Sequence, residues 1–311
     1  ASTVADCWSL GDITACQVKV QKTLPDNASV SAASANQESW YQTDPHIIIT
    51  PPDSTDSPQP ESAPITVYYK LWNRSQGETE ATAPVHTFTG QQPAITQDGE
   101  YMLLVWTEDE AGNQCRQSQR ILREYQVDFT DPVISLSYNN NNAQNQNYYG
   151  AGRTATITVE ELNFNPDKIQ VEITATRQGQ PISVPALSSW VSQGTTHRAT
   201  VSFAADGDYT IRVSGSDRAD NTAAPIETQS FTVDTQAPEL AISGVEDLSA
   251  NPDPISLVIS YSDINLDIQR ISFSLQGSQR GSVPVEGTPA PNRNGYVLRL
   301  PALSIDDNYR L

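Results

Sequence analysis

Acidic residues in repeated turns are the side chains of this sequence whose spacing could support chemistry. Asp98-Gly99-Glu100-Tyr101 recurs as Asp206-Gly207-Asp208-Tyr209, and an Asp-x-Ala-x-Asn turn follows each copy. If turns from neighbouring domains meet, their carboxylates could supply the six to eight oxygen ligands that Ca²⁺ prefers. The carboxylates that could converge are Asp98, Glu100, Asp128, Asp131, Asp217 and Asp220. Because Asp also forms turns by bonding to its own backbone, the sequence favours turn formation, with calcium as the alternative.

The histidines and the known catalytic motifs give no sign of an active site. His46, His86 and His197 are scattered and none lies near a cysteine, so we expect solvated strand residues rather than metal ligands. The sequence contains no Gly-x-Ser-x-Gly elbow, glycine-rich phosphate loop or His-Glu-x-x-His motif. Carboxylates are numerous, but they cluster in turns. The sequence therefore predicts a protein that is not an enzyme, with no catalytic, cofactor-binding or metal-binding residue.

The three cysteines, Cys7, Cys16 and Cys115, are too few for a disulfide scaffold and lack the spacing of a zinc site. If residues 1–25 form a hairpin, Cys7 and Cys16 face each other across it. We then expect a disulfide between these two, with Cys115 free. The rival pairing joins Cys115 to either N-terminal cysteine, and it requires the N-terminal segment to fold back along the first domain.

Aromatic side chains could stack on sugar rings if they were exposed. Trp72 and Trp106 alternate with Leu71 and Val105, so both tryptophans could face outward from one sheet. Packing in a core or at a domain joint is the role that the sequence favours. The candidates for glycan stacking are Trp40, Trp72, Trp106, Trp190, Tyr68, Tyr148 and Tyr149.

Composition excludes two classes of partner. The 311 residues carry a formal net charge of −19 with a sequence pI of about 4.3, so nucleic acid and anionic membrane surfaces are unsuitable. No run of 18 apolar residues occurs, and we expect no membrane insertion. Charged residues make up only 18% of the chain, so Ser, Thr, Asn and Gln fill most polar positions. Such polar faces are typical of extracellular β-proteins.

Apolar and polar residues alternate with a period of two over most of the chain. The alternation is clearest where Ala155, Ile157 and Val159 are interleaved with threonines, and it recurs at 169–175. Turn residues separate these runs, and no amphipathic helix lies between them. Strands with one buried face form antiparallel sandwiches, so the sequence predicts an all-β fold. The polar run at 139–147 is expected to be a mobile connection between two strands.

The linkers repeat with the period of a small domain. Val127-Asp128-Phe129-Thr130-Asp131-Pro132 matches Val233-Asp234-Thr235-Gln236-Ala237-Pro238, and the two prolines lie 106 residues apart (238 − 132). Val20 and Pro25 have the same spacing, so the first segment looks like the tail of a preceding repeat or an N-terminal hairpin. The predicted division is residues 1–25, followed by immunoglobulin-like modules at 26–130, 131–236 and 237–311, the last one truncated.

Tyrosines follow the acidic turns at equivalent positions. In immunoglobulin-type sandwiches, a tyrosine near the start of strand F bonds its hydroxyl back to the E–F corner. Tyr101, Tyr209 and Tyr309 are placed where that tyrosine belongs. The sequence therefore predicts three tyrosine corners in register.

The chain resembles the tandem bacterial immunoglobulin-like repeats of secreted and cell-wall-anchored surface proteins. The resemblance covers most of 38–311, although Arg218 and Asp220 depart from the usual Asp-x-Ala-Gly-Asn turn. It implies tandem β-sandwiches that form an extracellular stalk, spacer or adhesin segment, and no catalytic centre; we expect a monomer. The alternatives are a module that binds a glycan or host protein, and an accessory region of a large secreted hydrolase whose catalytic domain lies outside this chain. The matching segments are Ser39-Trp40-Tyr41, Tyr68-Tyr69-Lys70-Leu71-Trp72, Asp98-Gly99-Glu100-Tyr101, the turn at 109–113 and the two linkers.

Overall fold

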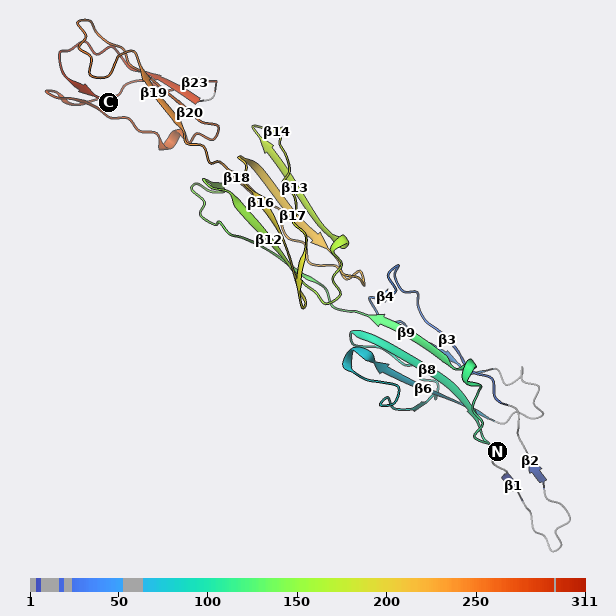
Figure 1. The fold of residues 1–311 in the computed structure, drawn as a ribbon. Coiled ribbons are helices and arrows are strands. Elements are labelled where there is room, and N and C mark those ends of the chain that lie inside the picture. Colours follow the sequence, from blue (N-terminus) through green and yellow to red (C-terminus); the bar gives the residue numbers. More distant parts are fainter. Residues whose placement is uncertain (1–3, 7–16, 20–23, 53–63, 294) are drawn as a thin grey trace, which may run out of the picture.

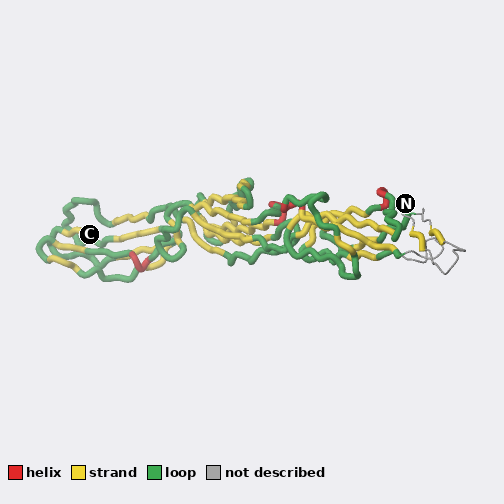
Figure 2. The backbone as a smooth tube through the Cα atoms, turned by 90° about the horizontal axis from the view of Figure 1, so that it is seen from below, coloured by secondary structure: helices red, strands yellow, loops and turns green. Residues whose placement is uncertain are grey.

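Three antiparallel β-sandwiches lie end to end in an elongated array (Figures 1 and 2). The structure is a computed structural model that describes residues 4–6, 17–19, 24–52, 64–293 and 295–311. Within these residues the regular elements are strands and four short 3₁₀ helices, with no α-helix. The predicted all-β fold of tandem immunoglobulin-like sandwiches is confirmed.

The second sandwich has the strand order of an immunoglobulin fold. Its first sheet has the order β10-β12-β16-β15, formed by β10 (Val133–Tyr138), β12 (Arg153–Glu160), β16 (Thr196–Phe203) and β15 (Val191–Gln193). Its second sheet has the order β11-β18-β17-β13-β14, formed by β11 (Tyr148–Tyr149), β18 (Gln229–Val233), β17 (Gly207–Gly215), β13 (Ile169–Arg177) and β14 (Gln180–Pro181). The pairs are antiparallel except β11 with β18, which run parallel.

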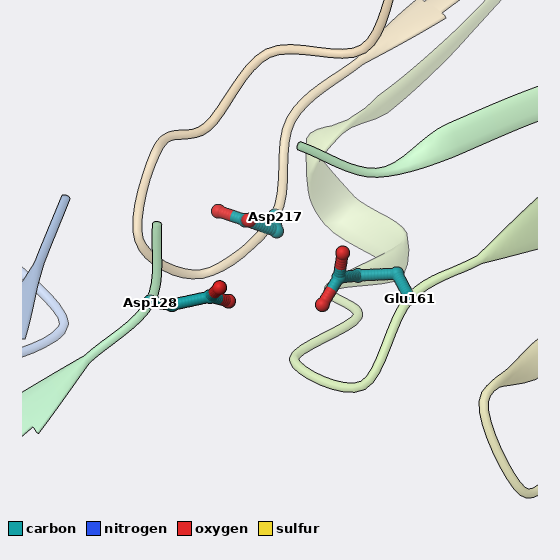
Figure 3. A group of neighbouring side chains, drawn as sticks. All are labelled: Asp128, Glu161 and Asp217. Carbon is teal, nitrogen blue, oxygen red and sulfur yellow. The ribbon is translucent and has the colours of Figure 1, made fainter. Parts of the chain in front are cut away.

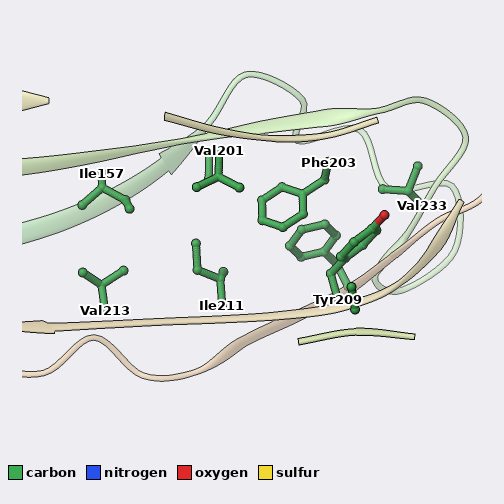
Figure 4. Close-up of a cluster of buried hydrophobic side chains, with 10 residues drawn as sticks. Ile157, Val201, Phe203, Tyr209, Ile211, Val213 and Val233 are labelled. Atoms are coloured by element: carbon green, nitrogen blue, oxygen red, sulfur yellow. The ribbon is translucent and has the colours of Figure 1, made fainter. Parts of the chain in front are cut away.

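Alternation of residue type places the core of the second sandwich between its sheets. Along β12, Ala155, Ile157 and Val159 are buried while the threonines between them are half-buried. Side chains from the facing strand β17 complete the layer, and Phe203 packs edge-on against Tyr209 with ring centroids 5.0 Å apart (Figure 4). Burial of these apolar faces supplies the main stabilisation, at about 25 cal/mol per Å².

The first sandwich has an uneven pair of sheets. The larger sheet has the order β4-β9-β8-β6-β7, formed by β4 (Trp40–Tyr41), β9 (Ile121–Val127), β8 (Gly99–Asp109), β6 (Ile65–Asn73) and β7 (His86–Thr87). The smaller sheet pairs β3 (Ser29–Ser31) with β5 (Ile48–Thr50). Beside β5 the side chain of Gln92 replaces a neighbouring strand, because its amide accepts from Ile49 N over 2.7 Å and donates to Ile49 O over 3.1 Å.

The third sandwich follows the plan of the second. One sheet has the order β19-β20-β24-β23, formed by β19 (Glu239–Ser243), β20 (Val258–Ser262), β24 (Gly295–Arg299) and β23 (Ala290–Asn292). The other sheet contains β22 (Gly281–Val283), β21 (Leu275–Gly277) and β25 (Tyr309–Arg310). At the N-terminus, β1 (Val4–Asp6) pairs with β2 (Gln17–Lys19). The predicted disulfide between Cys7 and Cys16 lies outside the described residues.

The three predicted tyrosine corners are present. The hydroxyl of Tyr101 donates to the carbonyl oxygen of Gln97 over 3.1 Å. Tyr209 bonds to Ala205 O over 2.9 Å in the same way, and the hydroxyl of Tyr309 bonds over 2.9 Å to the carbonyl four residues upstream. Each sandwich therefore pins its E–F corner by one hydrogen bond.

The polar run at 139–147 connects β10 to β11, the two-residue strand that precedes β12. An arginine anchors it, because Arg153 Nε donates to Asn140 O over 2.9 Å. The guanidinium of Arg153 also lies 3.8 Å from the ring centroids of both Tyr138 and Tyr149. The expected mobility of this connection stays a prediction.

Candidate functional site

The E–F turn of the first sandwich holds the linker between the first two sandwiches. Asp98 Oδ1 accepts from Phe129 N over 2.6 Å, and its Oδ2 accepts from Thr130 Oγ1 over 2.6 Å. Both oxygens of Asp98 therefore bond to the linker, 31 and 32 residues away in the sequence, which differs from the local turn that the sequence favours. Pro132, with its fixed φ, then leads into β10.

Asp128 connects this linker to the second sandwich. Its Oδ1 accepts from Thr130 N over 3.0 Å, which closes the turn, and its Oδ2 accepts from Asn163 Nδ2 over 2.6 Å. Its backbone carbonyl accepts from Asn221 Nδ2 over 2.9 Å. Side chain and backbone of one residue therefore bind two different loops of the next sandwich.

Two further carboxylates reach the same point from those loops. Asp217, in the loop after β17, accepts from Asn221 N over 3.0 Å and from Asn221 Nδ2 over 2.9 Å. Glu161 follows β12, and its Oε1 accepts from Asn163 N over 2.7 Å. Ligand atoms of Asp128, Glu161 and Asp217 lie within 4.8 Å of one another (Figure 3). The joint thus gathers three carboxylates from three segments.

The electrostatics of this carboxylate cluster are unusual because it is buried. Asp128 is 1% exposed, Glu161 6% and Asp217 1%. Within the described part of the chain, no Lys, Arg or His side chain forms an ion pair with any of them. Burial raises the pKa of Glu161 and that of Asp217, and the neighbouring carboxylates add to both shifts.

Such a cluster has two ways of reducing its negative charge. It can retain a proton at the raised pKa values, or its oxygens can coordinate a divalent cation, since Ca²⁺ prefers carboxylate and carbonyl oxygens. Asp128, Glu161 and Asp217 are the residues that could hold such an ion. The prediction of no metal-binding residue stays a prediction.

A second contact lies beside the cluster at the same joint. Asn165, which caps the 3₁₀ helix η3 (Pro166–Lys168), donates from Nδ2 to Glu38 Oε1 over 3.0 Å. Lys168 Nζ lies 3.3 Å from Glu38 Oε1 and 2.7 Å from Asp220 Oδ1. Burial opposes the charge of Lys168, but its hydrogen bonds to Asp220 and Glu38 raise its pKa. Residues of both sandwiches are therefore joined through one lysine.

The six predicted carboxylates separate into different roles. Asp128 and Asp217 converge, whereas Asp98 holds the linker. Glu100 lies 3.6 Å from Arg74 NH2 in an exposed ion pair, and Asp131 is exposed. Hydrogen bonds from Lys168 and Asn36 lower the pKa of Asp220.

Sequence reasoning missed Glu161 and Asn163. A signal was present, because Glu161-Leu162-Asn163-Phe164-Asn165 shares its pattern with Asp263-Ile264-Asn265-Leu266-Asp267. Both segments read acidic–apolar–Asn–apolar–Asx, and they directly follow β12 and β20. In an immunoglobulin fold this segment is the loop between strands B and C, called here the B–C loop. It lies at the N-terminal end of the sandwich, so the predicted joint should have included it.

The tryptophans are packed rather than displayed. Trp72 and Trp106 do point away from the main core of the first sandwich, but they are buried in a separate cluster with Cys115. Tyr68 stacks on Trp106 with ring centroids 5.7 Å apart. Trp40 is also buried. The predicted preference for packing over a sugar platform agrees with these positions.

The remaining aromatic candidates are partly packed, and the third cysteine is buried. Trp190 packs edge-on against Phe164 at 5.1 Å, Tyr149 is half-buried against Phe231, and Tyr148 is exposed. Cys115 is a free, buried cysteine, as predicted.

One histidine was wrongly predicted to be solvated. His197 is buried, and its ring stacks on Phe164 with centroids 4.0 Å apart. Its Nε2 lies 2.7 Å from the carbonyl oxygen of Glu161, and its Nδ1 lies 2.7 Å from Ser192 Oγ. Because a carbonyl only accepts, Nε2 carries the proton. His46 and His86 are exposed, as expected.

Comparison with known proteins gives structural neighbours and no sequence family. No protein-family model and no curated protein matches the sequence. Among solved structures, a three-domain titin fragment (I67–I69, an E-to-A variant) is 8% identical, with a TM-score of 0.35 over 85% of this chain and 82% of that one. FdeC, an Escherichia coli adhesin, is 15% identical, with a TM-score of 0.31 over 92% of this chain and 91% of that one.

Similarity at this level does not bear on function, and the immunoglobulin-like fold is defined by the strand order and the tyrosine corners. No helix among the described residues has the length and apolar character needed to cross a membrane.

Proposed function

We propose that this chain is a spacer segment of an extracellular, adhesin-type surface protein. Modules at 26–130, 131–236 and 237–311 would act as rigid units that hold a part binding a glycan or a protein at a distance from the cell. The bacterial surface origin comes from the sequence resemblance. The array is monomeric in this proposal.

The observation that carries this function is the construction of the first joint. A flexible linker would leave its polar groups to water, whereas here the side chain and backbone of Asp128 bond to Asn163 and Asn221 across the joint. Residues Glu38 and Asn165 form a second contact across the same joint. Two separated contacts oppose bending more effectively than one.

The linker itself supports the same function. Its backbone is fixed by Asp98 on one side and by Asp128 on the other, and Pro132 restricts the chain before the next strand. Interfaces between domains of one chain are commonly mobile unless they are well packed. Here the buried polar contacts replace a large apolar interface.

Small-angle X-ray scattering tests the proposal. A variant with a flexible Gly-Ser insertion between Thr130 and Asp131 provides the comparison, because it separates the sandwiches without altering either core. We expect the wild-type profile to fit one extended particle, and the insertion variant to require an ensemble of bent shapes. If both proteins require the same broad ensemble, the spacer function is wrong.

A further inference from the structure

The second joint repeats the contacts of the first. Asn163 Nδ2 donates to Asp128 Oδ2 over 2.6 Å at the first joint, and Asn265 Nδ2 donates to Asp234 Oδ2 over 2.7 Å at the second. Glu161 Oε1 accepts from the backbone of its asparagine over 2.7 Å. The equivalent residue, Asp263, accepts from its asparagine over the same distance. The same three positions therefore make the same bonds twice.

A second contact point also recurs, but the amide and the carboxylate change places between the two joints. At the first joint the cap of η3, Asn165, donates to the carboxylate of Glu38. At the second joint the cap of η4 (Ile268–Arg270) is Asp267, which accepts from Asn145 Nδ2 over 3.3 Å. Glu38 precedes β4 and Asn145 precedes β11, and both strands pair in parallel with the last strand of their sandwich.

The preceding sandwich holds its own linker in the same way at both joints. Asp206 Oδ1 accepts from Thr235 N and from Thr235 Oγ1, each over 2.9 Å, as Asp98 does from Phe129 and Thr130. The carboxylate of Asp206 also lies 3.7 Å from Arg177 NH2. At both joints an aspartate of the preceding sandwich therefore holds the linker in place before the following sandwich.

From these repeats we propose a two-point docking surface that consecutive sandwiches share. One end of each sandwich offers the linker aspartate and the loop before the strand that pairs in parallel. Its partner is the B–C loop of a following immunoglobulin-like module with the pattern acidic–apolar–Asn–apolar–Asx. The asparagine binds the linker aspartate, and the final Asx binds the preceding loop through a carboxylate–amide pair of either polarity.

The two points lie on different segments of the preceding sandwich, the linker and the loop before the parallel strand, so together they restrict rotation about the linker. The first point fixes the distance between sandwiches, and the second fixes their rotation about the linker. Exchange of amide and carboxylate keeps one carboxylate and one amide donor at the second point of each joint. This docking surface deepens the proposed spacer function and rests on it.

Distances between spin labels across each joint test the docking surface in the full chain. Cys7 and Cys16 are replaced by serine, and the buried Cys115 is kept. One pair of labelled cysteines, at the exposed positions Thr87 and Arg198, reports on the first joint. A second pair, at the exposed positions Arg198 and Ser282, reports on the second joint. Thermal unfolding of each variant verifies that the sandwiches remain folded.

Loss of the asparagine should loosen its own joint alone. Asn163→Ala should broaden the distance distribution at the first joint, and Asn265→Ala at the second, each raising the undocked population about fivefold for one lost hydrogen bond. Asn251→Ala is the matched control, since among the described residues its amide bonds to Ser249 alone, within one loop. Unchanged widths in both joint variants would overturn the docking surface.

Transplanting the second joint into the first is the sharper test. Asn165→Asp places two carboxylates together and should broaden the first joint. Adding Glu38→Asn gives the arrangement of the second joint, with the carboxylate at the cap and the amide in the loop of the preceding sandwich, and should restore the narrow distribution. If the double variant is as broad as the single one, the exchange of polarity is wrong.

The two proposals fail in different ways. A broad wild-type distribution at both joints would contradict the spacer function itself. A narrow wild-type distribution that persists in Asn163→Ala, Asn265→Ala and Asn165→Asp would leave a rigid spacer and refute the docking surface.

Discussion

Asn163 of the second sandwich and Asp128 at the end of the first are joined by a hydrogen bond of 2.6 Å between Nδ2 and Oδ2. The backbone N–H of the same asparagine bonds to Glu161, so Asn163 lies between two carboxylates of the buried cluster. It donates to both and accepts from neither. Asn163 therefore both connects the two sandwiches and donates hydrogen bonds to two of the buried carboxylates.

Stability should depend on pH through the buried carboxylates. The pKa of Glu161 is raised above its ordinary value of 4.5, so the folded state binds a proton at a pH where the unfolded chain does not. Without divalent cations, the free energy of unfolding should then rise as the pH is lowered from neutrality toward the ordinary pKa of a glutamate. Denaturant titrations at a series of pH values measure this free energy of unfolding.

Glu161→Gln should flatten this dependence, because glutamine keeps an acceptor for Asn163 N without the charge. Glu160→Gln, at the exposed neighbouring position, is the matched control and should retain the wild-type slope. Equal slopes in all three proteins would show that the cluster does not titrate in this range.

Calcium should raise the melting temperature at neutral pH by a few degrees. The sequence favours turn formation for these acidic residues, but burial of Asp128, Glu161 and Asp217 without a basic partner changes the expectation. Scanning calorimetry with calcium and with a chelator measures the shift, and Glu161→Gln should reduce it. Identical melting curves in the wild type would mean that protons alone neutralise the cluster.

Tyr209→Phe should destabilise the second sandwich by about 1 kcal/mol. The substitution removes the hydroxyl that bonds to Ala205 O over 2.9 Å, while the ring keeps its contact with Phe203. Chemical denaturation is the measurement, and Tyr148→Phe at an exposed position is the control. An unchanged midpoint would count against a stabilising tyrosine corner.

Arg153→Lys should also destabilise the second sandwich, by about 1–2 kcal/mol. Lysine cannot keep both the stacking between Tyr138 and Tyr149 and the directed bond to Asn140 O. Arg198→Lys is the control, because Arg198 is exposed. Equal unfolding free energies for both variants would show that the guanidinium does not anchor the loop.

Much of the fold could be predicted because its signals are local. Period-two alternation around Ile157 identifies a strand, and a tyrosine after an acidic turn identifies a corner whose bond spans four residues. The joint was harder, because its contacts bring together residues far apart in sequence, such as Asp128 and Asn221. Burial of His197 was missed for the same reason, since its partners come from a stacking ring and a carbonyl in another segment.

Rigidity of the first joint is the central claim, and one distance measurement tests it directly. Spin labels at Thr87 and Arg198 span the joint, and labels at Glu172 and Arg198 lie on opposite sheets within the second sandwich. Pulsed electron resonance on the wild-type array should give distributions of similar width for the two pairs. A distribution across the joint as broad as that of the variant with a Gly-Ser insertion after Thr130 would contradict the account.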